Sequence, residues 1–370
     1  MKKLTQENII DILYGCTVLG TGGGGNLEDG IAVMEQDFKE GKELYLASLD
    51  ELPDEAYIAT PYCCGAPAAL DAEEDEKYKE LPHIGYPASI LAFRSLEEYF
   101  GEKFFAVSST ELGGANTAEA LHTACQLGIP LMDGDPAGRS VPELQHSSYF
   151  VKNKPINPMT VATEYGDVVI LKDVVDDFRA EEIARSIACV SGAMVGVADH
   201  PMKGKDYKES IIPNAISYAM KIGEELRKAR ESGKDGEGVA GAIADAVEGK
   251  VLFKGSVEKT PWEQTGGFNI GEIYLTGTDT YAGEKYKIWF KNENIIAYRN
   301  DQIDVTAPDL ICMIGADGIP VTSPNFQKGM EINVLVLPSP DIWKTKEGLE
   351  CFGPRHFGFD VDYIPFNEKK

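Results

Sequence analysis

The sequence has little positive charge for its length. Its 370 residues include 35 lysines and arginines against 60 aspartates and glutamates, which gives a formal net charge of −25 at pH 7. Such a field repels phosphate backbones and anionic lipid, so we expect no nucleic-acid partner and no membrane partner. The chain contains no run of about 18 apolar residues, and Gln6, Glu7 and Asp11 interrupt its first residues, so we expect neither a membrane-spanning helix nor a signal peptide.

The cysteine pattern lacks the features of a disulfide framework. The seven cysteines are an odd number, they are scattered, and no two have the C-x-x-C spacing. The one close pair, Cys63 and Cys64, is adjacent in the chain, and adjacent cysteines rarely form a disulfide for steric reasons. We therefore expect reduced thiols and a cytoplasmic protein.

Several motifs of well-known enzyme classes are also missing. The chain has no H-E-x-x-H, no G-x-S-x-G and no G-x-x-x-x-G-K-[ST] motif. The sequence therefore does not indicate a zincin metalloprotease, a serine hydrolase or a P-loop nucleotide-binding protein. Gly20, Gly22 and Gly25 do match the spacing of the dinucleotide fingerprint G-x-G-x-x-G. That fingerprint follows a strand, whereas residues 6–19 have helical periodicity, so we expect no NAD.

The length favours two domains, and the hydrophobic periodicity divides the chain near residue 165. Residues 1–165 are predicted to form an α/β domain with a partly parallel sheet and glycine-rich loops. Residues 166–370 are predicted to form a helical segment, from about 179 to 247, followed by a β-rich C-terminal domain. In the first domain we expect helices at 5–19, 27–40, 87–100 and 117–126, strands at 43–47, 56–60, 103–108 and 129–132, and a loop at 61–67.

The first glycine-rich loop, residues 20–26, is predicted to face a small-molecule ligand. Its backbone N–H groups, at the start of a helix, suit a carboxylate, phosphate or imide oxygen. The substrate-binding candidates in this loop are Gly22, Gly23, Gly24, Gly25 and Asn26. The alternatives are a tight corner between two helices, and a capping role for Asn26.

Two further loops leave the ends of neighbouring predicted strands. Glu111, Gly113, Gly114 and Asn116 follow the first strand. Loops that leave the carboxyl ends of parallel strands lie at one edge of the sheet, so this loop is expected to meet the one that begins at Asp133. Asn116 has an alternative role as a helix cap, completed by Glu119, and Glu111 could equally be a solvated carboxylate.

The second of these loops carries Asp133, Asp135 and Arg139. Together with Glu111, the two aspartates are candidate catalytic residues, which could divide general acid and base roles or hold a divalent cation. Arg139 is a candidate for binding a carboxylate or imide oxygen with two hydrogen bonds. The alternatives are that Asp135 shapes its Asp-Pro turn and that Arg139 pairs structurally with Asp133.

Two other features remain open. Cys63 follows a predicted strand and is a candidate substrate-binding thiol, with a structural thiol as the alternative, because His83, His122 and His146 have no diagnostic spacing to it. Residues 353–358 are predicted to form a rigid clasp, a segment that fastens the end of the chain to the rest of the protein. From this segment, Arg355 or His356 could reach a site.

The three loops, residues 19–25, 111–116 and 133–143, resemble those of the S-methyl thiohydantoin desulfurase family, and the resemblance continues at 266–268, 292–297, 307–311 and 353–358. It implies a hydrolase or desulfurase that acts on a hydantoin-like or S-methyl thiohydantoin ring as its small-molecule substrate. The alternative is a binding protein or accessory subunit of a hydantoinase or oxoprolinase type system. The resemblance names no cofactor; a divalent metal fits but is not required, and a homo-oligomer is expected only on general grounds.

Overall fold

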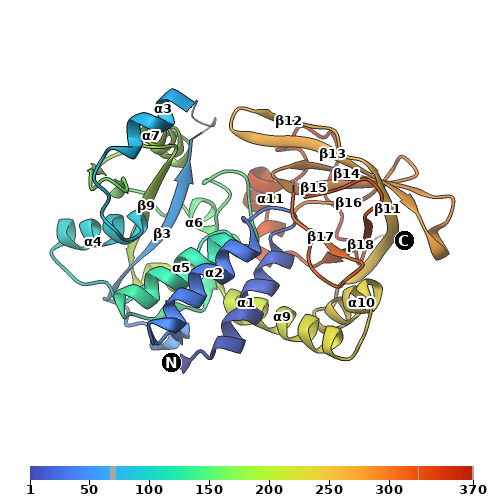
Figure 1. Ribbon diagram of the computed structural model, residues 1–370, viewed down its shortest axis with the longest axis horizontal. Coiled ribbons are helices and arrows are strands. Elements are labelled where there is room, and N and C mark those ends of the chain that lie inside the picture. Colours follow the sequence, from blue (N-terminus) through green and yellow to red (C-terminus); the bar gives the residue numbers. More distant parts are fainter. Residues whose placement is uncertain (67–71, 324, 369–370) are drawn as a thin grey trace.

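The computed structural model describes residues 1–66, 72–323 and 325–368 and places two domains beside each other (Figure 1). The first domain contains a mixed eight-stranded sheet of order β1-β2-β5-β4-β3-β9-β7-β8. Strands β2, β5, β4 and β3 are parallel, whereas β1, β9, β7 and β8 pair antiparallel. The predicted partly parallel sheet is thus confirmed. The strands are β1 (Lys2–Lys3), β2 (Tyr45–Ala47), β3 (Tyr57–Gly65), β4 (Ala106–Val107), β5 (Leu131–Met132), β7 (Met159–Ala162), β8 (Val168–Leu171) and β9 (Met194–Lys203).

Three helices of the first half begin within one residue of their predicted starts at 5, 27 and 87, whereas the helix predicted to begin at 117 begins at Gly114 and the helices at 72–79 and 148–151 are additional. Thr5 and Asn26 cap the first two helices, since Thr5 Oγ1 accepts from Asn8 N at 3.1 Å and Asn26 Oδ1 accepts from Glu28 N at 2.7 Å. The helices are α1 (Gln6–Leu19), α2 (Leu27–Lys39), α3 (Ala72–Lys79), α4 (Ala88–Phe100), α5 (Gly114–Leu127), α6 (Ser148–Val151), α7 (Asp177–Cys189) and α8 (Gly204–Ser210), with the 3₁₀ turn η1 (Leu49–Glu51).

The predicted loop at 61–67 is wrong as far as residue 65, because β3 continues to Gly65. The continuation pairs antiparallel with β9, which lies inside the segment predicted to be helical. Pro61 is compatible with this strand because β3 pairs with β4 only at Ile58 and Ala59, so that one edge of β3 is free at the proline. Pro67 lies outside the described residues.

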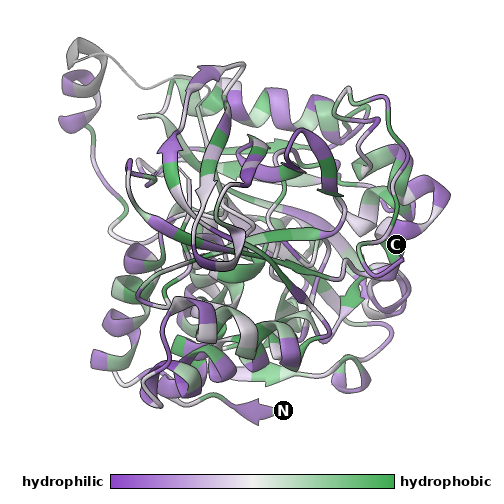
Figure 2. Cartoon of the chain, turned by 90° about the vertical axis from the view of Figure 1, so that its right-hand side faces the viewer, coloured by the Kyte–Doolittle hydropathy of each residue, from purple (hydrophilic) through white to green (hydrophobic). Residues whose placement is uncertain are grey.

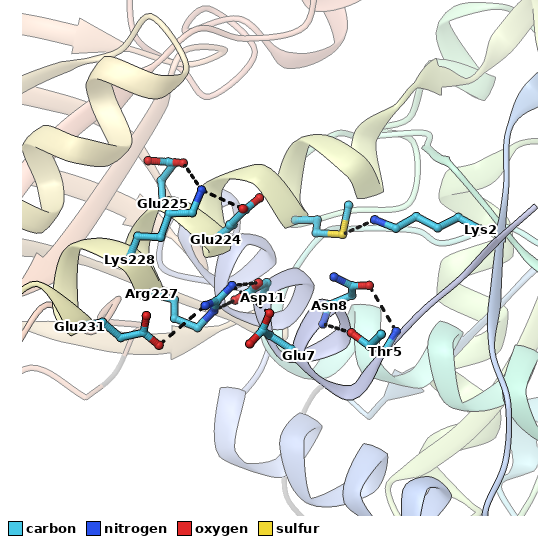
Figure 3. Close-up of polar contacts among 11 residues, drawn as sticks. Lys2, Thr5, Glu7, Asn8, Asp11, Glu224, Glu225, Arg227, Lys228 and Glu231 are labelled. Atoms are coloured by element: carbon cyan, nitrogen blue, oxygen red, sulfur yellow. Dashed lines mark hydrogen bonds and ion pairs between the residues drawn. The ribbon is translucent and has the colours of Figure 1, made fainter.

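Two helices, α9 (Ala215–Glu231) and α10 (Gly236–Ala246), connect the halves, with only residues 232–235 between them. Helix α9 packs closely on α1: a Cβ on Gly15 would lie 1.8 Å from the Ala219 carbonyl oxygen, so this crossing requires glycine. The guanidinium of Arg227 also forms two hydrogen bonds to the Asp11 carboxylate, of 2.8 and 2.9 Å (Figure 3). These contacts fix α9 on the first domain.

The second domain is an antiparallel sheet of order β16-β15-β14-β13-β11-β18-β17, with β12 paired to β13. Green, hydrophobic residues follow the strands that cross the middle of Figure 2. The predicted β-rich C-terminal domain is confirmed. The strands are β11 (Lys250–Lys259), β12 (Trp262–Thr265), β13 (Phe268–Gly277), β14 (Lys285–Lys291), β15 (Glu293–Arg299), β16 (Gln302–Thr306), β17 (Leu310–Gly315) and β18 (Glu331–Leu337).

A few short elements complete the fold. The turns η2 (Asp279–Tyr281) and η3 (Asp341–Lys344) and the helix α11 (Lys346–Phe352) belong to the second half. A two-stranded ribbon pairs β6 (Gly134–Asp135) with β10 (Ile212–Pro213) and so carries the loop after β5 against the start of α9. Across the described ranges, no helix has the length and apolar character needed to cross a membrane.

Candidate active site

A cavity of about 540 Å³ lies where the glycine-rich loop of the first domain meets the second domain. Its wall is rich in carboxyl, amide and glycine residues and includes two thiols. Four of the lining residues, Asn269, Asn292, Glu293 and Ser323, come from the β-rich domain. The other lining residues are Gly22, Gly23, Gly24, Gly25, Tyr62, Cys63, Cys64, Thr110, Glu111, Ala115, Asn116, Glu119, Ser140, Val141, Pro142, Glu143, Leu144, Glu181, Arg185 and Met194.

The glycine-rich loop is held by the second domain through its carbonyl groups. Thr21 O accepts from Asn294 N at 2.8 Å, and Gly22 O accepts from Ser323 N at 2.7 Å. Within the described part of the chain, the N–H groups of Gly24 and Gly25 have no protein acceptor, and both residues line the cavity. These two N–H groups are therefore available to an oxygen atom of a ligand.

Gly113 and Gly114 do not line the cavity; they allow two loops to approach. A Cβ on Gly113 would lie 2.3 Å from the Cα of Gly24, and one on Gly114 would lie 2.7 Å from the Cα of Leu27. The Gly24 carbonyl accepts from the N–H groups of Ala115 and Asn116, at 3.1 and 3.2 Å. The first turn of α5 is thus satisfied by the glycine-rich loop, and its N–H groups are not offered to a ligand.

Glu111 and Asn116 meet in the cavity wall, as the sequence predicts for two residues of one loop. Asn116 Nδ2 donates to Glu111 Oε2 at 3.3 Å. Burial, together with the nearby carboxyl groups of Glu293 and Glu181, raises the pKa of Glu111 well above its usual 4.5. Glu111 also has a positive φ of 58°, a strained conformation for this residue type. The suggested capping role of Asn116 is wrong, because Gly113 is the N-cap of α5.

Glu293, at the start of β15, is the main cavity residue that the sequence analysis missed. Its side chain is 3% exposed, and its Oε2 has no hydrogen-bond partner among the described residues. Burial raises its pKa to about 8, although the Arg139 guanidinium opposes the shift. Its position next to a glycine-rich loop 270 residues earlier depends on the packing of two domains, so no local sequence signal identifies it.

Glu143 differs from these two carboxyl groups. Burial disfavours its charged form, but a hydrogen bond from His356 and the charges of His146 and Lys291 outweigh this and lower its pKa to about 2. Its Oε2 lies 3.0 Å from Lys291 Nζ. The cavity therefore combines two carboxyl groups whose pKa values are raised, Glu111 and Glu293, with one whose pKa is lowered, Glu143, a division typical of acid–base sites.

Asp133 does not line the cavity, contrary to its predicted role. Its two carboxylate oxygens accept from the backbone N and the hydroxyl of Ser217, in the first turn of α9. The ribbon of β6 and β10 brings the Asp133 loop to this helix. The carboxylate thus satisfies the start of α9 instead of facing a substrate.

Asp135 and Arg139 also do not line the cavity, although both lie close to residues of its wall. Asp135 Oδ1 accepts from Ala137 N and Gly138 N, at 2.8 and 2.7 Å, which confirms the alternative of a turn-shaping role. Burial raises the pKa of Asp135 to about 6. Arg139 is fully buried and donates to Thr21 Oγ1 at 2.8 Å and to the Pro308 carbonyl at 3.0 Å, so it is a link between the domains and not a partner of Asp133.

The remaining candidates divide between two cavities. Cys63 lines the 540 Å³ cavity, where the surrounding atoms and the Glu119 carboxylate raise the pKa of its thiol well above 9.0 and so disfavour a nucleophilic thiolate. Asn26 caps α2 and lines a second cavity of about 670 Å³, on the Tyr14 side of the glycine-rich loop. This second cavity is larger, but neither Glu111 nor Glu293 lines it.

The fold and the cavity define a class of protein, in which an α/β domain and a β-rich domain enclose a cavity lined by several carboxyl groups. The chain belongs to the S-Me-THD-like family: the model of the S-Me-THD-like N-terminal domain matches residues 7–173, and that of the C-terminal domain matches residues 175–366. The family resemblance read from the loops is thereby confirmed.

Among solved structures, a crystal structure of a protein from Chromobacterium violaceum is similar to this chain. The TM-score is 0.79 at 21% sequence identity, and the match covers 99% of this chain and 100% of that chain. At this identity the likeness concerns the fold alone. No curated protein matches the chain.

Proposed function

We propose that this protein is a hydrolase that removes methanethiol from an S-methyl thiohydantoin or closely related ring in the cavity between the domains. Membership in the S-Me-THD-like family supports the substrate class. The observation that carries the proposal is the presence of two carboxyl groups with raised pKa values in one cavity wall, the partly exposed Glu111 and the buried Glu293. The accessory-subunit alternative has no observation in its favour.

The two carboxyl groups suit the two proton transfers that the reaction needs. A carboxyl group with a pKa of about 8 is a strong base once ionised, so Glu293 takes a proton from the attacking water. Glu111, whose pKa is raised well above its usual 4.5, is the proton donor to the ring nitrogen. Water oxygen bonds to the carbon that carries sulfur, which gives a tetrahedral intermediate.

When the intermediate collapses, Glu111 takes up a proton and Glu293 gives one up. The new hydroxyl group returns a proton to Glu111 as the carbon–oxygen double bond forms and the carbon–sulfur bond breaks. The leaving thiolate takes the proton from Glu293, so methanethiol departs and both carboxyl groups regain their starting states. One water is consumed, and the products are the hydantoin and methanethiol.

The glycine-rich loop and two side chains orient the ring in this scheme. The N–H groups of Gly24 and Gly25 bind a ring carbonyl or the negative charge that develops on it. The Arg185 guanidinium, which is held by Glu181 at 2.7 Å, and the Asn116 amide offer further donors along the wall. Arg185 suits a substituent that carries a carboxylate.

Release of thiol from S-methyl thiohydantoins by the purified protein tests the proposal. We expect turnover in the wild type, with a kcat that rises with pH through an apparent pKa of about 8. Glu293→Gln removes this rise and lowers kcat about 100-fold or more, and Glu111→Gln lowers kcat similarly. Glu98→Gln, on the exposed face of α4, is the matched control and leaves kcat unchanged. Absence of thiol release by the wild type, or full activity of both cavity variants, contradicts the proposal.

A further inference from the structure

A group of metal-ligating side chains lies beside the cavity and has no part in the proposed reaction. Glu143, His146 and His356 each present one ligand atom, and these atoms lie within 4.8 Å of one another. Glu143 lines the cavity, His146 is fully buried behind it, and His356 comes from the segment at 353–358 that the sequence suggests is a clasp. Within the described ranges, no other set of three His, Cys, Asp or Glu side chains has this spacing, and Glu111, Asp133 and Asp135 do not form one.

The three atoms have the spacing of a metal's ligands. His146 Nε2 lies 2.9 Å from His356 Nε2 and 3.6 Å from Glu143 Oε2, and His356 Nε2 lies 4.0 Å from the same oxygen. The point equidistant from the three atoms is about 2.1 Å from each, which is the usual length of a zinc bond to imidazole nitrogen or carboxylate oxygen.

The arrangement of the two imidazoles supports the same conclusion. Their Nε2 atoms face each other, and His146 is packed among the rings of Phe352, His356 and Phe357, at centroid distances of 5.0, 4.8 and 5.7 Å. Without a metal the 2.9 Å contact is a hydrogen bond, with a proton on one of the two nitrogens. When both rings carry their proton on Nδ1 instead, both Nε2 lone pairs are available to a shared cation. The aromatic surroundings fix the His146 ring in this orientation.

Lys291 is paired with the Glu143 ligand, so its charge must be accommodated. Its Nζ lies 3.0 Å from Glu143 Oε2 and 4.0 Å from the centroid of the Phe268 ring. A carboxylate has two oxygens, each with two acceptor sites, so Glu143 can bind a metal ion and still accept from Lys291. The ammonium then partly offsets the carboxylate charge, which weakens binding but does not exclude it.

We propose that Glu143, His146 and His356 bind one divalent transition-metal ion of the zinc type. Two imidazole nitrogens and one carboxylate oxygen favour zinc, cobalt or nickel over magnesium or calcium, which prefer oxygen ligands alone. Because His356 lies near the end of the chain and the other two ligands lie in the first domain, the ion fastens the C-terminal segment to the wall of the cavity. This site does not depend on the proposed reaction.

The test measures binding to chelator-treated, full-length protein. We expect isothermal titration with zinc chloride to give one site per chain, and cobalt chloride to give visible absorption bands of a site with nitrogen and oxygen ligands. His356→Ala weakens zinc binding at least about 100-fold, since it removes a direct ligand. The matched control is His83→Ala, which removes an exposed histidine that also pairs with a glutamate, Glu164, at 3.2 Å; it binds zinc as the wild type does.

Further variants and measurements keep the outcome clear. Glu143→Gln removes the carboxylate ligand without a change of shape and also weakens zinc binding, while excess magnesium chloride does not compete. Circular dichroism of each variant checks the fold, and zinc raises the Tm of the wild type but not that of His356→Ala. The proposal is overturned if the wild type takes up no stoichiometric zinc, or if His356→Ala and Glu143→Gln both bind zinc as tightly as the wild type.

Discussion

Gly23 of the first domain lies directly against Glu293 of the second. A Cβ built on Gly23 would be 2.0 Å from Glu293 Oε1 and 2.7 Å from its carboxyl carbon. No side chain fits at position 23 while Glu293 keeps its place. The glycine-rich loop therefore admits a carboxyl group of the other domain into the cavity wall.

Gly23→Ala is expected to displace the Glu293 carboxyl group into the cavity and to destabilise the protein by about 1 kcal/mol, because the added methyl overlaps the end of a side chain that borders open space. Thiol release falls with it if Glu293 acts as proposed. Gly241→Ala is the control: nothing lies within 4 Å of a Cβ there, and alanine favours the helix α10, so stability is unchanged or slightly raised. Equal free energies of unfolding in urea for Gly23→Ala and Gly241→Ala would argue against the close contact between Gly23 and Glu293.

Glu293 is expected to make stability fall as pH rises. Its pKa is about 8 in the folded protein against a usual 4.5, so between these values the folded state holds a proton that the unfolded state releases. The contribution of Glu293 to the free energy of unfolding is complete below pH 4.5. It decreases as the pH rises toward 8, and the free energy of unfolding then falls by at most about 1.4 kcal/mol per pH unit. Unfolding of Glu293→Gln and the wild type between pH 5 and 9 measures it. Identical slopes for both proteins count against a buried, protonated Glu293.

Asp133→Asn is expected to affect stability and not chemistry. The carboxylate bonds the backbone N and the hydroxyl of Ser217, so its loss costs about 1–2 kcal/mol, as for other helix-end contacts. Ser217→Ala in the same background adds less than its own separate effect, because the two residues share one contact. A large loss of kcat in Asp133→Asn with unchanged stability restores the catalytic role that the sequence suggested.

Cys63→Ser is expected to keep most of the thiol-releasing activity. The pKa of the Cys63 thiol lies well above 9.0, so the reactive thiolate is scarce at neutral pH. The serine variant keeps the size and polarity of the wall and should retain more than about half of the wild-type kcat. A loss of 100-fold or more, or labelling of Cys63 by a ring analogue, points to covalent catalysis instead.

The local parts of the fold could be predicted from the sequence, and the reason is visible in particular residues. Thr5 and Asn26 cap helices through bonds to residues two or three positions away. The unit of β4, α5 and β5 also follows from periodicity within about 30 residues, and Glu111 and Asn116 meet because they belong to one loop.

The long-range parts could not be predicted. Strand β9 pairs with β3 across some 135 residues, and its surroundings have helical patterns, so the sequence gives no local sign of it. Asp133 stands at the expected strand end, but the ribbon of β6 and β10 turns its loop toward α9. Glu293 enters the site only through the packing of two domains, which leaves no spacing to recognise.

A crystal structure of Glu111→Gln soaked with an S-methyl thiohydantoin tests the location of the site most directly. We predict the ring in the cavity between the domains, with an oxygen within hydrogen-bond distance of Gly24 N or Gly25 N and the sulfur-bearing carbon facing Glu293. A ring bound only in the cavity on the Tyr14 side, or only on the outer face of the β-rich domain, would contradict the account.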